Sequence, residues 1–197
     1  MTLQSNSPID PIFLEARTHY SWTDRPVDDA LLRRVYETAR MAPTSANSQP
    51  ARFVFVKSAE GKSRLRPALN QGNVEKTMLA PVTAIVAYDL EFYENIPKVF
   101  PVRPEMKTLL SNMPPPARDF YLVQNASLQA AYLILAARAL GLDCGPMGGF
   151  DRAAVDGAFF STVPWKSILL INLGHGDPAK VQPRNPRLEF DDACRIE

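Results

Sequence analysis

Glycine, cysteine and histidine are all scarce in this chain of 197 residues, and each shortage narrows what the protein can be. The chain has 9 glycines against 18 prolines, whereas average usage is roughly 7% glycine and 5% proline. This ratio disfavours a protein built on glycine-rich phosphate loops. The two cysteines, Cys144 and Cys194, form neither a C-x-x-C pair nor a disulfide framework. A reducing cytoplasm is therefore the simplest compartment.

Net charge and long apolar runs are also lacking. Lys and Arg number 22 and Asp and Glu number 21, so no overall field draws the chain to nucleic acid or to an anionic membrane. The first ten residues lack the charged start and apolar run of a signal peptide. The longest apolar stretch, 128–140, is shorter than the roughly 20 residues that span a bilayer. We therefore expect a cytoplasmic protein with no nucleic-acid and no membrane partner.

Apolar residues are plentiful, at 46% of the chain, which is enough to bury a sizeable core. At about 150 residues per domain, the length predicts one domain. We expect a flexible N-terminus over 1–10 and a single domain over 11–197, whose last part, 174–197, forms a proline-containing arm. Neither an internal repeat nor a linker marks a second domain.

Hydrophobic periodicity predicts long helices mixed with a few strands. Helices are expected over 11–22, 60–70, 74–79 and 117–140. Two more are expected, one from an N-cap at Asp28 to a stop before Pro43 and one that begins at Asp151. Strands are expected over 52–57, 82–89 and 166–173. The segment 117–140 is apolar nearly all round, which is typical of a helix buried in a core or a subunit interface. The proline-rich segment 90–116 predicts an irregular excursion suited to covering a site. Together these elements indicate an α+β fold.

One familiar motif is excluded by its context. Residues 174–179, GHGDPA, match the dinucleotide-binding pattern G-x-G-x-x-[GA] directly after a strand. The helix and second strand of that fold do not fit in the residues after Ala179, and Pro178 falls where the helix would begin. The sequence has no G-x-S-x-G elbow, and neither His19 nor His175 has further ligands at metal-binding spacing. We therefore predict no Rossmann fold, no hydrolytic centre and no metal site.

Several polar groups remain, spread along the chain: Arg17-Thr18-His19, the loop 44–49, Asn73, Lys76, Gly148-Gly149, Arg184 and Arg187. Each alone has an ordinary structural explanation, such as capping by Thr18 or a turn at Asn47. Together they suit one ligand with a phosphate at one end and a planar, hydrogen-bonding ring at the other. Arginines donate to phosphate in pairs of bonds, amides offer donors and acceptors to a ring edge, and glycine lets backbone N–H groups approach closely.

Five separated segments carry a resemblance to a known family: ARTHYSWTDRPV, APTSANSQPARFVFV, GNVEKTMLAPVTAIVA, ALGLDCGPMGGFD and NPRLEF. Their order resembles that of the nitroreductase-like family of flavin mononucleotide (FMN) enzymes, over about 13–194. Within that family, RTHYSW, PTSANSQPAR, LRPALNQGN and PVTAIVAYDLEFYE are most similar to the malonic semialdehyde reductase branch of bacterial pyrimidine catabolism.

The resemblance implies a fold and a partner. The family fold is α+β, with a four-stranded antiparallel core sheet flanked by helices. It forms a homodimer in which the partner's C-terminal arm adds a fifth strand. The apolar helix over 117–140 would then lie at the dimer interface, and the tail over 174–197 would be the arm that crosses to the partner.

The resemblance also implies an activity, that of an FMN-dependent NAD(P)H oxidoreductase. NADPH or NADH would deliver a hydride to the flavin, and a small acceptor would then take it. Malonic semialdehyde, reduced to 3-hydroxypropionate, is the first expectation for this acceptor. The alternatives are a broad-specificity nitro-compound or quinone reductase, a member of the dehalogenase or flavin-fragmenting branches, and a flavin-binding protein without turnover.

Roles for single residues follow from the same resemblance. The phosphate and ribityl chain would be met by Arg17, Thr18, His19, Arg184 and Arg187. The other subunit would contribute Pro43, Thr44, Ser45 and Asn47. The pyrimidine edge of the ring would contact Asn73 and Lys76, and the backbone of Gly148 and Gly149 would face the hydride-carrying nitrogen. Lys76 would act as an electrostatic stabiliser of the reduced ring, with no side chain required as an acid. The candidate cations for an acidic acceptor are Arg103, Lys107 and Arg118.

Four positions depart from the family pattern. Relatives often have two arginines where this chain has Ala16 and Arg17, and a further basic residue where it has Tyr20. The nitro-compound reductases carry a glutamate at the position of Gly148 and an aromatic residue at that of Ala51. The sequence therefore leaves open the flavin affinity, the acceptor, and the preference for NADH or NADPH.

Overall fold

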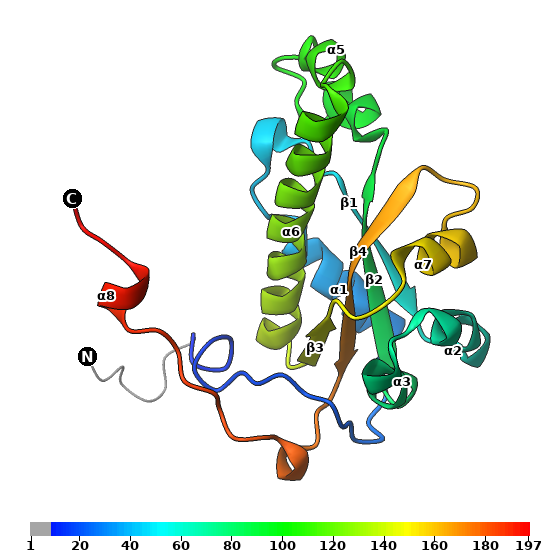
Figure 1. The fold of residues 1–197 in the computed structure, drawn as a ribbon, viewed down its shortest axis with the longest axis vertical. Coiled ribbons are helices and arrows are strands. Elements are labelled where there is room, and N and C mark those ends of the chain that lie inside the picture. The colour runs from blue at the N-terminus through cyan, green and yellow to red at the C-terminus, as the bar shows by residue number, and fades with distance from the viewer. Residues whose placement is uncertain (1–8) are drawn as a thin grey trace.

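The computed structural model describes residues 9–197, so most of the predicted flexible N-terminus lies outside the described residues. The elements along the chain are α1 (Asp29–Ala39), β1 (Ala51–Val56), α2 (Ala59–Leu65), α3 (Gln71–Met78), β2 (Val82–Asp89), α4 (Ile96–Val99), α5 (Met106–Ser111), α6 (Pro115–Ala139), β3 (Asp143–Met147), α7 (Arg152–Phe159), β4 (Trp165–Gly174) and α8 (Phe190–Ala193) (Figure 1). Short 3-10 helices are η1 (Ser45–Asn47), η2 (Arg66–Ala68), η3 (Phe92–Asn95) and η4 (Pro178–Lys180).

The four strands form one sheet in the order β1-β2-β4-β3, and each neighbouring pair is antiparallel. This confirms the predicted four-stranded antiparallel sheet. At one end of the sheet Ala51 pairs with Tyr88 and Asp89 with Trp165, and at the other Gly174 pairs with Asp143. We call these the Asp89 end and the Gly174 end.

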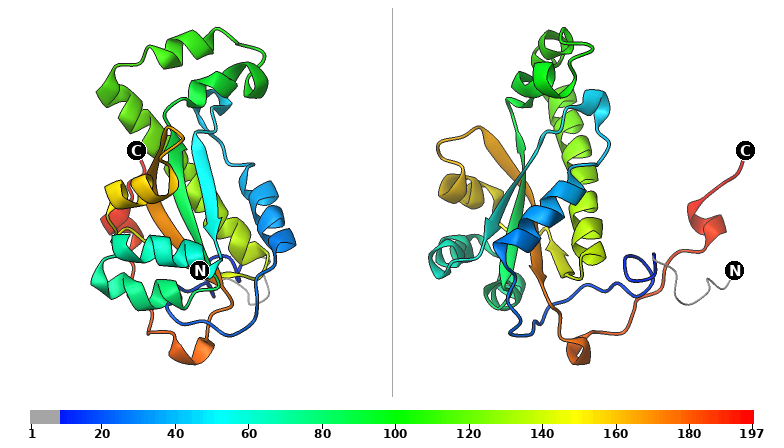
Figure 2. Two further views of the ribbon diagram at one scale, coloured as in Figure 1. Left: turned by 90° about the vertical axis from the view of Figure 1, so that its right-hand side faces the viewer. Right: turned by 180° about the vertical axis from the view of Figure 1, so that it is seen from behind.

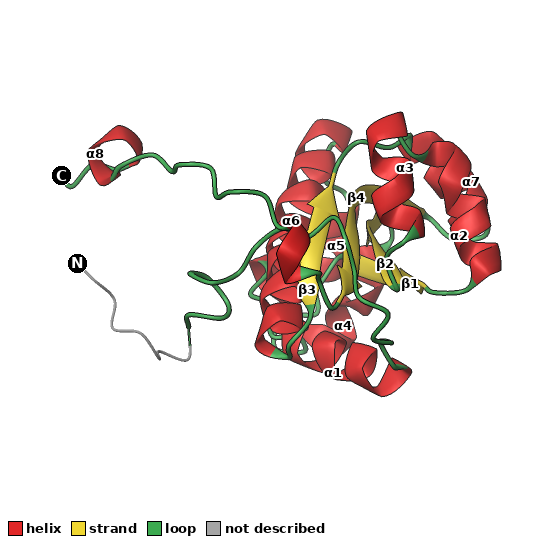
Figure 3. Ribbon diagram, turned by 90° about the horizontal axis from the view of Figure 1, so that it is seen from below, coloured by secondary structure: helices red, strands yellow, loops and turns green. Residues whose placement is uncertain are grey.

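Helices cover both faces of the sheet, with α1 and α6 on one side and α2, α3 and α7 on the other (Figures 1 and 3). Side chains of β2 enter both cores: Val82, Ala84 and Val86 pack with α1 and α6, and Ile85 and Ala87 pack with α2 and α7. A strand buried on both faces has an unbroken apolar sequence, which explains the run over 82–89.

The long helix α6 is a core helix on one side and exposed on the other. Its residues Ala130, Leu133, Ala136 and Ala137 are buried against α1 and the sheet, and Leu122 packs on the cluster of η3, α4 and α5. Large apolar side chains emerge on the remaining surface: Phe120, Val123, Leu128 and Tyr132. Its length and hydropathy would suit a membrane span, but its packing makes it the central helix of this domain. The expected burial on every side is thus not reached within one chain.

Local sequence signals at the helix ends are confirmed. The Asp28 side chain accepts a hydrogen bond from the backbone N–H of Leu31, 2.6 Å away, as an N-cap does. Gly141 has φ +80° just beyond α6, and the N–H of Leu142 donates to the carbonyl of Ala137. This is the glycine-closed helix end that the sequence predicts.

Three predicted elements differ from the structure. Residues 9–15 form turns, and the segment after them is extended, because Thr18 pairs with Cys144 and Trp22 with Gly176 instead of forming a helix. Strand β3 was not expected because Gly145 and Pro146 are poor strand formers; at the sheet edge, a strand tolerates proline. The excursion over 90–116 is not irregular but contains η3, α4 and α5, packed on a cluster of their own.

Candidate functional site

The first half of the candidate site lies where the two terminal segments run side by side, at the Gly174 end. The N–H of Thr23 donates to the carbonyl of His175 (2.8 Å), and that of Asp177 to the carbonyl of Ser21 (3.1 Å). Figure 2 shows both segments below the sheet and leaving it together. We call the predicted residues near this junction the arm half: Arg17, Thr18, His19, Asn73, Lys76, Gly148, Gly149 and Arg184.

One carboxylate joins the two terminal segments to β3. Asp143 lies with Oδ1 3.3 Å from Nε2 of His19, and its Oδ2 accepts from the N–H of Gly176 at 2.8 Å. The His19 ring is buried so tightly that a Cβ on Gly176 would lie 1.9 Å from its Nδ1. His19 therefore fixes the junction, and only glycine fits opposite its ring.

Two of the three predicted phosphate arginines meet across this junction. Arg184 donates through Nη2 to the carbonyls of Leu14 (2.6 Å) and Ala16 (3.0 Å), and Arg17 donates to the carbonyl of Gln182. Arg187 lies on the exposed arm and donates to the carbonyls of its neighbours Asn185 and Pro186. Arg17 and Arg184 thus belong to one cluster, and no contact among the described residues ties Arg187 to it.

Helix α3 brings the predicted ring-binding residues to the same end. Asn73 donates through Nδ2 to the carbonyl of Gly149 at 2.6 Å, and a Cβ on that glycine would lie only 2.6 Å from the same nitrogen. Beside it, the Cα of Gly148 faces open space with no atom within 4 Å of a Cβ position. A side chain at Gly149 would displace the Asn73 amide from its bond, whereas the backbone at Gly148 is open to a ligand.

Tyr20 stands at a position where the resemblance leads one to expect a basic residue. It carries no positive charge itself, but its ring contacts the ammonium of Lys76. The Nζ of Lys76 lies 4.6 Å from the centroid of the Tyr20 ring, within cation–π range. The positive charge of the cluster is therefore supplied by α3 and the terminal arginines. Aromatic contact keeps the Lys76 ammonium on the side of the N-terminal segment.

A buried polar network that the sequence did not reveal lies behind α3. Lys62 of α2 donates through Nζ to the carbonyl of Thr77 (2.8 Å) and to Oγ1 of Thr83 (2.6 Å), and Asn172 donates to the carbonyl of Lys76 (3.2 Å). Burial lowers the pKa of Lys62 to about 8. The only signal in the sequence is the position of Lys62 one turn before Leu65, on the buried face of α2. The network fixes the end of α3 that carries Lys76.

The second half of the candidate site, the loop half, consists of Pro43, Thr44, Ser45 and Asn47. Ser45 donates from its N–H to Oδ1 of Asn125 (2.8 Å) and accepts at its carbonyl from the hydroxyl of Tyr121 (2.7 Å). Asn47 donates through Nδ2 to the carbonyl of Val99 (2.7 Å). These contacts attach the loop to α6 and α4, beside the Asp89 end of the sheet.

The two halves do not meet within one chain. The loop half adjoins the start of β1, whereas the arm half gathers around β3, the end of α3 and the start of the arm (Figure 2). Each residue of a strand spans about 3.4 Å, so β2 alone separates the ends by roughly 25 Å. Within one chain, a ligand would have to span about this distance to touch both halves.

The cations suggested for an acidic acceptor are mostly engaged elsewhere. Arg103 pairs with Glu105 at 3.0 Å and Lys107 with Glu94 at 2.6 Å, and all four side chains are exposed. Arg118 has a buried Nε with no hydrogen-bond partner among the described residues. Two of the three candidate cations, Arg103 and Lys107, are thus each paired with a carboxylate on the surface.

The fold and the arrangement of the arm half define a class of protein: the chain matches the model of the nitroreductase family over residues 14–175 and belongs to that family. A protein of Burkholderia lata, named provisionally as an NADH dehydrogenase/NAD(P)H nitroreductase, is 55% identical over 197 residues that cover all of both chains. A protein of Stutzerimonas stutzeri with the same provisional name is 55% identical over 194 residues, 96% of this chain and 98% of its own.

Solved structures share the fold. A protein of Exiguobacterium sibiricum, provisionally a nitroreductase and solved in complex with FMN, has a TM-score of 0.87 over all of both chains at 21% identity. A protein of Staphylococcus epidermidis, provisionally an NAD(P)H:FMN oxidoreductase, has a TM-score of 0.85 at 21% identity and covers 100% of this chain and 98% of its own. These likenesses establish the α+β nitroreductase fold with its four-stranded antiparallel sheet.

Proposed function

We propose that this protein is an FMN-dependent NAD(P)H oxidoreductase. The observation that carries the proposal is the convergence, in the arm half, of two cations, an amide and a glycine backbone open to solvent. Arg17 and Lys76 supply positive charge, Asn73 supplies an amide, and Gly148 leaves its backbone accessible. These groups fit a ligand with an anionic phosphate and a hydrogen-bonding ring. The FMN-bound relative and the names of the full-length relatives support the same cofactor and electron donor.

When bound, FMN supplies the redox chemistry by accepting a hydride from the nicotinamide and passing it to an acceptor. The chain's own residues would bind and orient it. Arg17 and Arg187 would hold the phosphate, Arg184 would join the two terminal segments beside it, and Asn73 would be fixed by its bond to Gly149 beside the ring. Lys76, supported from behind by the Lys62 network, would place a positive charge where negative charge develops. The protein would contribute to the rate by holding these groups in place before the reaction.

A nitro compound or a quinone is the acceptor that the observations favour. The relatives at 55% identity carry a nitroreductase name. Two of the three cations suggested for an aldehyde acid are already paired with carboxylates on the surface. Malonic semialdehyde is the second candidate, favoured by the similarity of RTHYSW and PTSANSQPAR to that branch.

We also propose that the protein acts as a homodimer. The outer edge of β1 has no strand beside it among the described residues, and a groove of about 1320 Å³ runs along it. Among the basic residues of that groove, Arg40, Lys57 and Arg52 are paired with Glu37, Asp29 and Asp89, and the groove's remaining positive charge comes from Arg33 and Lys98. The arm beyond β4 extends away from its own domain and ends in an acidic stretch that includes Glu189, Asp191 and Asp192 (Figure 3). The partner's arm therefore matches this groove in charge, and the expected fifth strand would lie along β1.

Anaerobic spectroscopy tests the proposed function. The purified protein, mixed with FMN and gel-filtered, should stay yellow, and NADPH or NADH should bleach it. Turnover with a nitroaromatic, a quinone and malonic semialdehyde then ranks the acceptors. A protein that retains no FMN would refute the proposal, and one that retains it without bleaching would be a binding protein only.

The oligomeric state has its own test. Sedimentation of the full chain should give a dimer, and a chain shortened to residues 1–186 should give a monomer that loses FMN. A full chain that sediments as a monomer and keeps FMN would refute the two-copy site.

A further inference from the structure

The loop that carries the loop half is bent into conformations that its residues disfavour. Ala46, Asn47 and Gln49 have φ angles of +52°, +47° and +44°, and none of them is glycine. Gln49 also precedes Pro50, and a residue before proline prefers φ near −120°. Such a conformation is strained for a residue other than glycine and persists only where the surroundings hold it. Interactions with the rest of the protein must therefore stabilise this loop.

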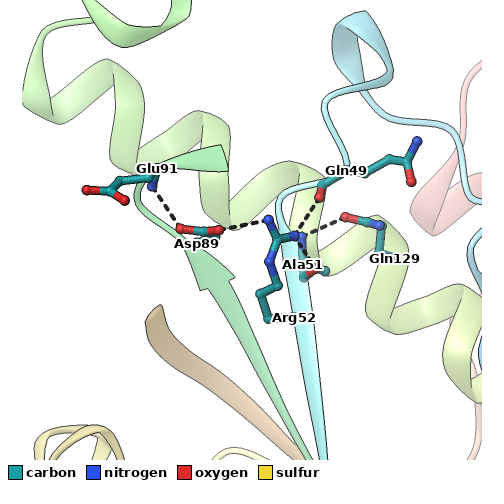
Figure 4. A network of polar contacts seen from close by, with 6 residues as sticks. All are labelled: Gln49, Ala51, Arg52, Asp89, Glu91 and Gln129. Atoms are coloured by element: carbon teal, nitrogen blue, oxygen red, sulfur yellow. Dashed lines mark hydrogen bonds and ion pairs between the residues drawn. The ribbon is translucent and has the colours of Figure 1, made fainter. Parts of the chain in front are cut away.

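The guanidinium of Arg52 provides such interactions (Figure 4). Its Nη1 donates to the carbonyls of Gln49 (3.0 Å) and Ala51 (2.9 Å), and its Nη2 donates to Oδ2 of Asp89 (2.7 Å). The other oxygen of Asp89 accepts from the N–H of Glu91 at 2.9 Å. One planar group thus bridges the strained end of the loop and the last residue of β2.

The surroundings make this bridge rigid. The side chains of Arg52 and Asp89 are 21% and 12% exposed, so their attraction is only partly screened. The backbone N–H of Asp89 donates to the carbonyl of Pro50 (3.0 Å), and that of Ala51 to Oε1 of Gln129 (2.9 Å). A guanidinium holds several acceptors in fixed directions, which a lysine ammonium does not. The loop therefore leaves the sheet at a fixed angle.

We propose that Arg52 and Asp89 form a positioning pair that holds the loop half in its binding geometry. The inference rests on the proposed function, in which this loop contacts FMN bound to the second subunit. The pair touches neither the cofactor nor the acceptor. It acts through the backbone of Gln49, which fixes where Thr44, Ser45 and Asn47 lie.

The test compares two matched carboxylates in the full-length protein. Asp156 is 13% exposed, pairs with Lys166 and accepts from the N–H of Ser167, but it lies on α7 away from the loop. We expect Asp89→Asn and Asp156→Asn to lower stability by similar amounts. Only Asp89→Asn should speed hydrogen exchange in residues 44–49 and weaken FMN binding, by about tenfold, the equivalent of 1.4 kcal/mol.

A second variant separates positioning from general destabilisation. Glycine adopts positive φ at no steric cost, so Gln49→Gly removes the strain that the pair holds. In the Gln49→Gly background, Asp89→Asn should therefore weaken FMN binding by less than about threefold, a non-additivity expected of coupled sites. Equal losses in both backgrounds, or equal effects of the two carboxylate variants on loop exchange, would overturn the inference. A wild-type protein that binds no FMN would instead refute the proposed function.

Discussion

The two halves of the candidate site are built in opposite ways. The arm half collects residues from positions 17 to 184, and its contacts are mostly bonds to backbone carbonyls and close approaches to glycine. The loop half is one short segment, and it is held by an ion pair and by side chains of α6. The first half depends on distant parts of the chain being paired, and the second depends on local strain being resisted.

The cations that support these halves, the half-buried Arg52 and the buried Lys62, also differ from each other. Arg52 has a carboxylate partner, Asp89, whereas the partners of Lys62 within residues 9–197 are neutral oxygens. The pKa of Lys62 is accordingly lowered by burial. The loop half is thus held by a charge pair, and the arm half rests on an ammonium that burial disfavours.

The largest expected effect comes from mixing variants of the two halves. Lys76→Glu reverses a charge in the arm half, and Asn47→Pro is incompatible with φ +47° in the loop half. Each variant alone should lose at least about tenfold in activity, since contacts to charged groups contribute 1.5–3 kcal/mol. In mixed two-fold dimers, co-expressed at equal levels, about a quarter of the sites should be intact and activity should return. Absence of recovery would place both halves in one chain.

The next effect concerns the junction of the terminal segments. Gly176→Ala should lower the free energy of unfolding by about 3 kcal/mol, because its Cβ overlaps the buried His19 ring. Gly157→Ala is the control: nothing lies within 4 Å of its Cβ position, and in α7 it should stabilise by roughly 0.5–1 kcal/mol. Denaturant unfolding measures both. Similar values for the two would show that the junction is loose.

The cation behind α3 gives a pH-dependent prediction. The folded pKa of Lys62, about 8, lies below the ordinary lysine value of 10.5, so the unfolded chain binds more protons between these values. The titration of Lys62 therefore raises the free energy of unfolding of the wild-type protein from pH 8 to 10.5. The Lys62→Met variant lacks this contribution. The stability of Lys62→Met relative to wild type should fall by on the order of 2 kcal/mol over that range. A pH-independent difference would mean that Lys62 titrates normally.

Taking the difference from wild type is essential in that experiment. Burial raises the pKa of Cys144 to about 12, so its thiol keeps its proton in the folded state after the unfolded chain has lost it. The stability of both proteins therefore falls above about pH 9 for this second reason. The Cys144 contribution cancels in the comparison of the two proteins.

The smallest expected effects distinguish the role of Arg184, in the arm half, from that of Arg187, on the exposed arm. Arg187→Ala should weaken FMN retention about tenfold with little change in stability, because its present contacts are local and exposed. Arg184→Ala should instead lower stability by about 1 kcal/mol through loss of its bonds to Leu14 and Ala16. Dilution of the holoprotein and thermal melting distinguish the two. The reverse pattern would assign the phosphate to Arg184.

Much of the fold could be predicted because its signals are local. The apolar run of β2, the Asp28 cap and Gly141 after α6 act within a few residues, and each is confirmed. Strand β3 and the extended segment around Thr18 could not be predicted, since they form by long-range pairing: β3 pairs with β4, Thr18 with Cys144 of β3, and Trp22 with Gly176 just after β4. Long-range pairing overrides weak local preference there.

The candidate site shows the same limit. Resemblance to a family selected the residues of both halves, and the structure brings Arg17, Asn73, Lys76 and Gly149 together at one end. Their supports, Asp143, Lys62 and the Arg52–Asp89 pair, were not found. A supporting side chain is recognised by its contacts, and its residue type alone resembles ordinary surface charge.

The pairing of the terminal segments has a consequence for the chain as it is made. Arg17 and Gln182 are 165 residues apart, and translation at about 5–20 residues per second separates them by roughly 10–30 s. During that interval the sheet can form around β1 and β2, while the segment after Arg17 waits for the partner that holds it extended. A chain that ends before β4 therefore has only part of its core and lacks both Arg184 and the junction that joins the two terminal segments. Binding of FMN would then indicate that synthesis of the chain has continued into the arm.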